Sequence, residues 1–576
     1  NRWAMTIRAV TARPRVLTGS AGGALLLLVA LAILTVSPVA MLVYGGLRDA
    51  PIGAPGHFTL ENVVRVLFSS RVLVVLETSL IAAVAVLGGL AVGGIGLAWL
   101  VGRTNLPGAP IFEAVFTLPL YLPPIMLAVA WAMLGAPRVG LLNVLSRSVL
   151  GFEIIDVYSS GGVIWYLMVF SIAFHLSFAA GAFRAFDASL EEAGRVSGAR
   201  PRAVLAKIVV PLLFPVLSGA FLYSFVRSFE AFEGPLLLGL QAGVKMISVE
   251  IYDLVQNRLP PEYSMASAMG VLSIGLLLPL TWYQWRLLER RSYVILGGRG
   301  YRAASYDLGP WKVPAFLLCV VVTIVLVVLP ISQLVLGSLT RFFGIFQAGF
   351  TWDHYREVLS NGQLLRALRN SAILASIGAS LSLLLGGLIA YVVARSRSVP
   401  RGLRMALNFL SWLPLTVPGI VLALGFLWFY AFSPLPLYAT RTGLVVAYII
   451  IVLPLVVRAM VGAFSQISSE LEEAGRVSGA RWSRTIVAVL LPLVWPSALI
   501  AWILAFVNIV RDLSTSVLLV PPGQPVFSTA LLELWGRGRI EQVCALSVLV
   551  MVPMLLARYL VGRLQAYEIR MRSTVR

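Results

Sequence analysis

Charged residues are scarce in this sequence, and lysine, histidine and cysteine are nearly absent. Asp, Glu, Lys and Arg together make up 12% of the 576 residues, whereas hydrophobic residues make up 59%. A soluble protein of this length needs a large charged surface. The composition therefore excludes a soluble globular protein, and a mean hydropathy of +0.90 indicates a polytopic membrane protein.

The few residues that could support chemistry are scattered. His57, His175 and His354 lie far apart in the sequence, and Cys319 and Cys544 both lie inside apolar runs. Neither a disulfide framework nor a cluster of metal ligands is indicated. We find no pattern typical of a serine or metal hydrolase, so we expect no catalytic residue, no metal site and no enzyme activity.

A phosphate-binding loop is also missing. Its lysine must be followed by serine or threonine. The three lysines, Lys207, Lys245 and Lys312, are followed by Ile, Met and Val. This chain therefore cannot supply an ATPase site of that type.

The net charge of +20 could suggest a nucleic-acid partner, but its distribution indicates a membrane. Basic residues gather in short segments between apolar runs that are long enough to cross a bilayer. With a cytoplasmic N-terminus, the inside segments hold more than half of the 45 basic residues, so we expect both termini in the cytoplasm. The predicted spans are 21–46, 73–102, 112–134, 162–184, 205–229, 264–287, 312–337, 367–395, 405–432, 442–464, 485–510 and 541–564.

The chain divides near its middle. Segment 288–311 carries several arginines and glycines and no long apolar run, which is typical of a linker. We predict a cytoplasmic N-terminal segment at 1–20, a first six-span half at 21–287, a cytoplasmic linker at 288–311 and a second six-span half at 312–576.

The two halves contain an internal repeat. Residues 191–200 and 472–481 both read EEAGRVSGAR, an identity of ten residues. Similar segments precede both copies: 57–67 resembles 349–359, and 118–125 resembles 413–420. Because each half has six spans and begins on the same side, the repeats are parallel, related by an axis along the membrane normal. The expected fold is all-α, with twelve transmembrane helices in two parallel six-helix repeats.

The repeated segment predicts a short helix, a sharp turn and a second helix on the cytoplasmic side. Ser189 with Glu192, and Ser469 with Glu472, have the spacing of a capping box. Gly198 and its repeat Gly479 stand where a helix ends in a residue that tolerates positive φ.

This pattern resembles the signature of ABC-importer permeases, in which a Glu-Ala-small segment precedes a glycine and an alanine. The resemblance covers nearly the whole chain and implies the type I ABC importer permease fold. In that family the segment is a coupling helix that docks on a separate ATPase subunit. Carried over residue by residue, the ATPase-coupling positions are Glu191, Glu192, Ala193, Gly194, Arg195, Gly198 and Ala199, and Glu472, Glu473, Ala474, Gly475, Arg476, Gly479 and Ala480. The usual second alanine is glycine in both copies.

The resemblance also implies partners. We expect two copies of a cytoplasmic ABC ATPase, which would hold the ATP and magnesium, and a periplasmic or lipid-anchored solute-binding protein. No nucleic acid is expected, and this chain itself should bind no cofactor. The location implied is the bacterial cytoplasmic (inner) membrane.

Charges near the outer ends of the fifth spans are candidates for the solute pathway. Ionisable groups at membrane depth usually face a bundle interior or a hydrated cavity. Aligning the halves sets Glu230 opposite Arg511, and either a shared outer gate or ordinary interfacial positions would explain them. The candidate set is Arg227, Glu230, Glu233, Asn508, Arg511 and Asp512.

Prolines interrupt the third span of both halves. Pro119, Pro123 and Pro124 in the first half, and Pro414 and Pro418 in the second, each remove a backbone hydrogen bond. The pattern predicts a break there, either as a bending point or as a purely structural kink.

The solute is read from resemblance alone. Segments 228–255 and 511–535 resemble fused permeases of the ferric-iron branch, whose relatives handle thiamine, polyamines, sulfate and phosphonates. Ferric iron or an iron chelate is our first expectation, with thiamine, a polyamine, a phosphonate or another small solute as alternatives. An ATP-independent secondary transporter with twelve spans is the competing class, and the repeated motif argues against it.

Overall fold

The computed structural model describes residues 17–184, 186, 188–290, 306–345, 349–396, 398–479 and 482–575. The predicted N-terminal segment and linker therefore lie largely outside the described residues. Where the chain is described, helices dominate and the only β pairing consists of isolated bridges. This agrees with the predicted all-α class.

The first half contains long apolar helices and several helices of only a few turns. In chain order they are α1 (Leu17–Gly46), α2 (Glu61–Phe68), α3 (Ser70–Gly89), α4 (Ile95–Arg103), α5 (Ala109–Phe116), α6 (Pro124–Gly135), α7 (Leu141–Leu150), α8 (Ser160–Arg184), α9 (Ala188–Val196), α10 (Pro201–Val204), α11 (Val210–Phe229), α12 (Ile247–Gln256) and α13 (Tyr263–Arg290).

The second half repeats this order without a counterpart of α7. Its helices are α14 (Lys312–Thr323), α15 (Leu329–Leu339), α16 (Asp353–Ser360), α17 (Gly362–Arg395), α18 (Arg401–Trp412), α19 (Gly419–Phe432), α20 (Arg441–Ser465), α21 (Ser469–Val477), α22 (Trp482–Thr485), α23 (Leu491–Val510), α24 (Ser516–Leu519), α25 (Phe527–Gly536) and α26 (Ile540–Val575). Short π and 3₁₀ turns join several of them, including η2 (Leu118–Leu120), η3 (Leu205–Val209) and η9 (Leu413–Thr416).

The number of spans agrees with the prediction. Within the described ranges, nine helices are long and apolar enough to cross a membrane, and three bent pairs bring the number to twelve if each pair is one span. The long second span of the first half runs through α3 and α4 as Ser70–Arg103. The twelve spans form two parallel sets of six.

Both third spans are broken where prolines were noted. The two helices of the pair bend by 100° between α5 and α6, and by 109° between α18 and α19. Pro124 begins α6, and Pro418 immediately precedes α19, positions where the missing N–H costs no helical hydrogen bond. The predicted break is confirmed, and most residues of α6 and α19, the helices that follow it, are buried.

Small polar contacts recur at matching places in the two halves. The amide of Ile247, at the start of α12, donates to Ser79 Oγ at 2.9 Å, and the amide of Phe527, at the start of α25, donates to Ser371 Oγ at 2.7 Å. Both serines are buried in the second spans. Each satisfies a helix N-terminal amide that would otherwise have no partner. The internal repeat therefore extends to individual hydrogen bonds.

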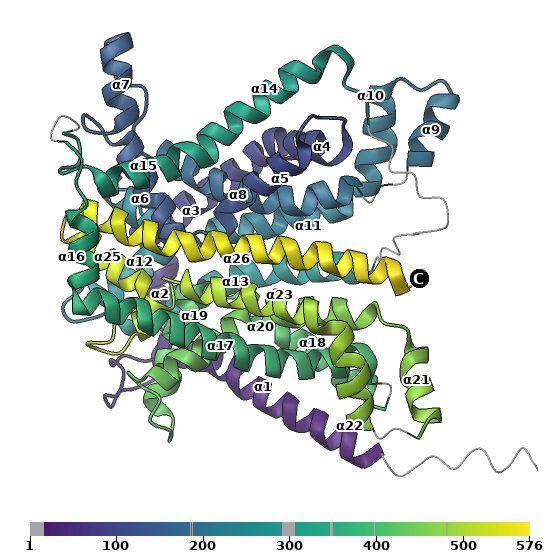
Figure 1. The fold of residues 1–576 in the computed structure, drawn as a ribbon. Coiled ribbons are helices and arrows are strands. Elements are labelled where there is room, and N and C mark those ends of the chain that lie inside the picture. Colours follow the sequence, from purple (N-terminus) through teal and green to yellow (C-terminus); the bar gives the residue numbers. More distant parts are fainter. Residues whose placement is uncertain are drawn as a thin grey trace, which may run out of the picture.

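The first span of each half packs on helices of both halves. Helix α1 packs chiefly on α19, α13 and α18, while α15 packs on α26 and α6. Figure 1 shows α14 lying with the first-half helices at the top, and α1 beneath α17 and α20 at the bottom. These contacts of the first spans hold the two halves together.

Candidate functional site

The two copies of the repeated decapeptide form projecting arms. They lie on α9 and α21, and Figure 1 shows both helices at the same end of the molecule, where α26 also ends. Each arm stops at its predicted glycine, with φ of +82° at Gly198 and +75° at Gly479. In the first arm, Pro201 then begins α10 as its sequence position allows.

The predicted capping boxes are wrong in register. Helix α9 begins at Ala188, so Ser189 lies within its first turn, and α21 begins at Ser469 itself. In the second arm the residue before the helix takes the capping role, since Ser468 Oγ accepts from the amide of Glu470 at 3.2 Å. Serine suits this position because its oxygen satisfies an unpaired first-turn amide.

The two arms present the same outward face. Leu190 and Val196 on α9 are 44% and 89% exposed, and Leu471 and Val477 on α21 are 42% and 89% exposed. Between these apolar positions lie the exposed residues Glu192, Ala193, Glu473 and Ala474. We call these eight residues the arm faces. An exposed apolar side chain that recurs in both copies is typical of a surface that binds another protein.

The glycine at the second small position has a steric reason. A Cβ on Gly194 would lie 2.8 Å from Ile208 Cδ1 and 3.2 Å from Val204 Cγ2, which belong to the helix that follows the arm. The missing side chain lets the arm lie close to η3 and α10. Glycine in place of the usual alanine therefore lets α9 pack closely against the helical segment that follows it.

Four of the predicted coupling positions fall partly or wholly outside the described residues. Ala480 is not described, and nothing is described of the side-chain surroundings of Arg195, Gly475 and Arg476. Ala199 is half-buried, and its amide donates to the carbonyl of Gly194 at 3.1 Å. That bond closes the end of the first arm.

The first glutamate of each arm faces inward. Glu191 Oε1 accepts from Arg103 Nη2 at 2.8 Å, and Glu472 Oε1 accepts from Arg395 Nε at 2.7 Å. Only the second glutamate of each copy, Glu192 or Glu473, remains exposed. Sequence reasoning treated both glutamates alike and did not single out the arginines, although both stand at the end of a second span.

The outer-end charges form local contacts. Glu230 pairs with Arg227 one turn before it, and Arg511 donates to the carbonyl of Leu120 in the first half. The guanidinium of Arg511 also lies 5.3 Å from the ring centre of Phe170. The structure thus pairs Glu230 within its own helix and not with Arg511, while Arg511 crosses between the halves.

Two other members of that candidate set have structural partners. Asn508 Nδ2 donates to the carbonyl of Leu504 in its own helix at 2.8 Å. Asp512 accepts from the amides of Thr515 and Ser516, at 3.2 and 3.1 Å, and so caps the short helix α24. Glu233 is half-buried in the segment between α11 and α12.

A charged cluster ties α12 to the start of the second span. Arg71 Nε lies 2.7 Å from Glu250 Oε1, and Lys245 Nζ lies 2.6 Å from Asp253 Oδ2. Partial burial alone would raise the pKa of Asp253, but hydrogen bonds from Lys245 and Asn257 and the nearby Arg71 lower it below its ordinary value. Asp253 therefore stays ionised and holds this corner of the first half in place.

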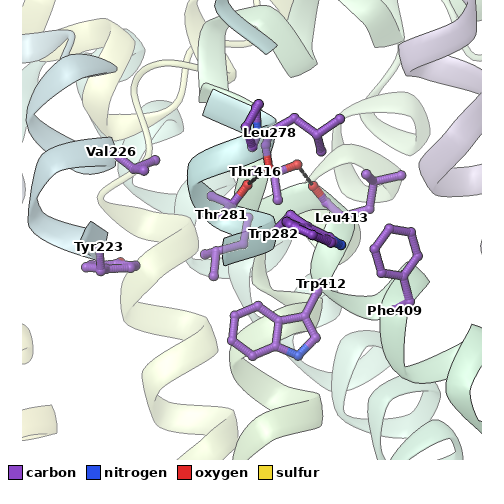
Figure 2. Close-up of a pocket in the computed structure, with 11 residues that line it drawn as sticks. Tyr223, Val226, Leu278, Thr281, Trp282, Phe409, Trp412, Leu413 and Thr416 are labelled. Atoms are coloured by element: carbon purple, nitrogen blue, oxygen red, sulfur yellow. Dashed lines mark hydrogen bonds between the residues drawn. The ribbon is translucent and has the colours of Figure 1, made fainter. Parts of the chain in front are cut away.

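An apolar cavity of about 270 Å³ lies on a seam between the halves. Its walls come from α11 and α13 of the first half, and from α18 and η9 of the second. Figure 2 shows the rings of Trp282, Trp412 and Phe409 gathered around it, with Tyr223 and Val226 across the space. The seam is therefore incompletely filled at this point.

At the corresponding seam on the other side, an arginine of the second half contacts the first half. There α26, the sixth span of the second half, faces the broken third span of the first half. Arg558 Nη2 donates to Thr117 Oγ1 at 3.4 Å, and its guanidinium lies 5.6 Å from the ring centre of Tyr121.

Among the described residues, no group of three or more His, Cys, Asp or Glu side chains is placed to hold a metal ion. Cys319 and Cys544 are both buried and unpaired with each other.

Comparison with known proteins identifies the family. The profile described as "Binding-protein-dependent transport system inner membrane component" matches residues 91–337 and 382–568. The chain is 28% identical over 523 residues to the ferric transport system permease protein FbpB of Actinobacillus pleuropneumoniae, covering 86% of this chain and 72% of that protein. It is likewise 28% identical over 511 residues to the putative ferric transport system permease protein FbpB 1 of Haemophilus influenzae, covering 84% and 76%.

Among solved structures, a bacterial ABC transporter involved in the import of the acidic polysaccharide alginate matches 44% of this chain and 89% of its own, at 17% identity and a TM-score of 0.37. The family profile covers both repeats and most of the sequence. The chain therefore belongs to the binding-protein-dependent transport system inner membrane components, with two copies of that family's domain fused in one ABC importer permease.

Proposed function

We propose that this permease is driven by two copies of a separate ABC ATPase, which dock on the arm faces of α9 and α21. The observation that carries the proposal is the duplicated exposed surface. Val196 and Val477 are both 89% exposed, and each stands beside an exposed glutamate and alanine on the same end of the molecule. Apolar residues next to charged ones suit a protein interface with a defined orientation.

The chain itself is a transport subunit of a multi-pass inner-membrane complex. In our proposal ATP and magnesium are bound by the partner, and this chain binds no cofactor. The end that carries the arms faces the cytoplasm, so both termini are cytoplasmic. A periplasmic or lipid-anchored solute-binding protein delivers the solute to the opposite face.

We propose ferric iron or an iron chelate as the solute. The support is the similarity of most of the chain to the two ferric transport permeases. A spermidine/putrescine permease of Haemophilus influenzae matches 39% of the chain at 25% identity. The alternative is that the same transporter imports a polyamine, thiamine or a phosphonate. Uptake measurements with each of these solutes would distinguish it from iron import.

We propose a transport cycle in which the two parallel halves move relative to each other. ATP binding draws the two ATPase subunits together, and the arms move with them. The halves then rock about their shared axis, the outer side opens to the solute, and hydrolysis resets the inward-facing state. We propose that Arg227, Glu230, Glu233, Asn508, Arg511 and Asp512 surround the outer gate, where Arg511 contacts the other half.

The test reverses the exposed arm charge in both copies. Glu192→Lys with Glu473→Lys should reduce solute-stimulated ATP hydrolysis by the purified complex at least tenfold, because like charges at an interface oppose docking. The folded yield of the permease should not change, since both side chains are exposed. Uptake into membrane vesicles provides the second measurement.

The matched control is Glu61→Lys on α2, which removes a solvent-exposed ion pair with Arg65 away from the arms. An exposed pair of that kind contributes little, so transport should stay at the wild-type level. ATP-independent uptake by the purified chain, or full activity of the double lysine variant, would contradict the proposal and favour a secondary transporter.

A further inference from the structure

We propose that Arg103 and Arg395 are positioning residues that fix each coupling arm to the second and fourth spans of its half. The inference rests on the proposed function, and it assigns the step by which motion of an arm reaches the membrane. Each arginine would act through its arm and not by touching solute or ATPase.

Arg103 joins three parts of the first half. It ends α4, the inner end of the second span, and its side chain is 3% exposed. Its Nε and Nη2 atoms donate to Glu191 Oε1 on the arm at 3.1 and 2.8 Å. Its Nη1 atom donates to the carbonyl of Phe186, just beyond the fourth span, at 3.1 Å. One guanidinium therefore holds the second span, the fourth span and the arm together.

Arg395 repeats this arrangement in the second half. It ends α17, and its side chain is 9% exposed. Its Nε atom donates to Glu472 Oε1 at 2.7 Å, and its Nη1 atom donates to the carbonyl of Ile467, just beyond α20, at 2.7 Å. A third bond runs from Nη2 to the carbonyl of Ser468 at 3.2 Å.

A guanidinium suits this junction for a chemical reason. Its donors are fixed in one plane, so bonds made in different directions lock the relative orientation of the groups that accept them. A buried charge with several hydrogen bonds is costly to rearrange, because every lost partner leaves a desolvated donor. The junction is therefore stiff, and displacement of an arm carries the two span ends with it.

The arginine-to-arm contact occurs in both halves, and this distinguishes it from an ordinary ion pair nearby. Arg184 and Glu113 form a close pair at the same end of the first half, with nitrogen–oxygen distances of 2.5 and 2.7 Å. Their counterparts in the repeat are Ser465 and Asn408, which cannot form an ion pair. The arginine-to-arm contact is thus kept in both halves where another contact is not.

A distance measurement tests the junction without any partner protein. Spin labels are placed on cysteines introduced at Val196 and Val477, both 89% exposed. The two native cysteines are buried, so labelling should be confined to the introduced ones. In the full-length permease in lipid nanodiscs, the distance between the arms should be narrowly distributed. Arg103→Ala with Arg395→Ala should broaden that distribution at least twofold.

A second, milder double variant tests the junction if the alanine variant does not fold. Glu191→Gln with Glu472→Gln keeps an acceptor on the arm and leaves the arginines bonded to the backbone carbonyls, so a smaller broadening is expected. The control is Arg258→Ala, which removes the pair with Glu262 at the outer end of α13 and should leave the distribution unchanged. A distribution of wild-type width in both junction variants would overturn the inference.

The functional consequence is separable from the proposed function. ATPase subunits should still co-purify with the Arg103→Ala, Arg395→Ala variant, because the arm faces are intact, while solute uptake per ATP hydrolysed should fall at least tenfold. If no ATPase co-purifies even with the wild-type chain, the proposed function fails. If ATPase binds and uptake per ATP stays normal in the variant, the junction proposal fails and the proposed function stands.

Discussion

At the scale of single residues, two glycines decide where the arms point. Gly198 and Gly479 have φ values of +82° and +75°, and no atom lies within 4 Å of a Cβ built on either one. Backbone conformation, and not lack of space, therefore requires glycine there. An L-residue in this region costs roughly 1–2 kcal/mol.

Alanine at these glycines should loosen the arms. Gly198→Ala with Gly479→Ala should speed amide hydrogen exchange in α9 and α21 about fivefold, the factor that ~1 kcal/mol of local destabilisation produces. Gly88→Ala in α3 is the control, because its φ lies outside the left-handed region and no atom is near its Cβ. Unchanged exchange in the arms of the double variant would show that the turn tolerates an L-residue.

Sequence reasoning at this scale succeeded where the signal is local. A glycine after a helical segment predicts positive φ, and both glycines confirm it. The inward glutamates and their arginine partners were not predicted, since Arg103 and Glu191 are 88 positions apart. No periodicity links residues on different helices. The usable signal was an arginine ending the second span of both halves.

At the scale of helices, the broken third spans shape the interior. In the second half the chain bends by 109° between α18 and α19, η9 packs on α13 near this bend, and the cavity lies along that contact. Hydrophobicity and proline predicted the break. They could not predict the angle, because the angle depends on what packs against each segment.

Filling the cavity should stabilise the contact between the two halves at this point. Thr281→Trp places a third indole beside those of Trp282 and Trp412. Burial of an aromatic side chain contributes roughly 1.5–3 kcal/mol, which should stabilise the present arrangement of the halves and reduce uptake tenfold or more while ATPase binding persists. Vesicle uptake and co-purification measure the two effects.

The control for the filled cavity is Leu276→Trp, an exposed position on the same helix that does not line the space. It should transport normally. Equal loss of transport in both variants would mean that the bulk of tryptophan, and not the seam, is responsible.

At the scale of the whole molecule, the two halves are repeats that also contact each other through their first spans. Repetition was predicted from an identical decapeptide, and the family profile confirms it by matching the chain twice. The packing of α1 on α19 and α18 of the second half, and of α14 and α15 on α5 and α6 of the first, was not predicted. The composition of a first span is the same whether it packs on its own half or on the other half. The sequence of the span therefore does not show which half it contacts.

The contacts between the halves hold in place the helices from which the arms extend. Each half is held by a helix from the other, and Arg511 adds a contact across the centre. Two arms on one end can then act on two halves that remain together while they rock. The account therefore depends on what binds the arm faces.

Site-specific cross-linking at the arm faces tests this most directly. A photo-reactive residue at Val196 or Val477, in cells that express the full transporter, should yield a product containing this chain and a polypeptide with a phosphate-binding loop, identified by mass spectrometry. The same residue at Val149 on α7, 81% exposed at the opposite end, should not capture that polypeptide. Products with the ATPase at both arms would support the account, and its absence from both would contradict it.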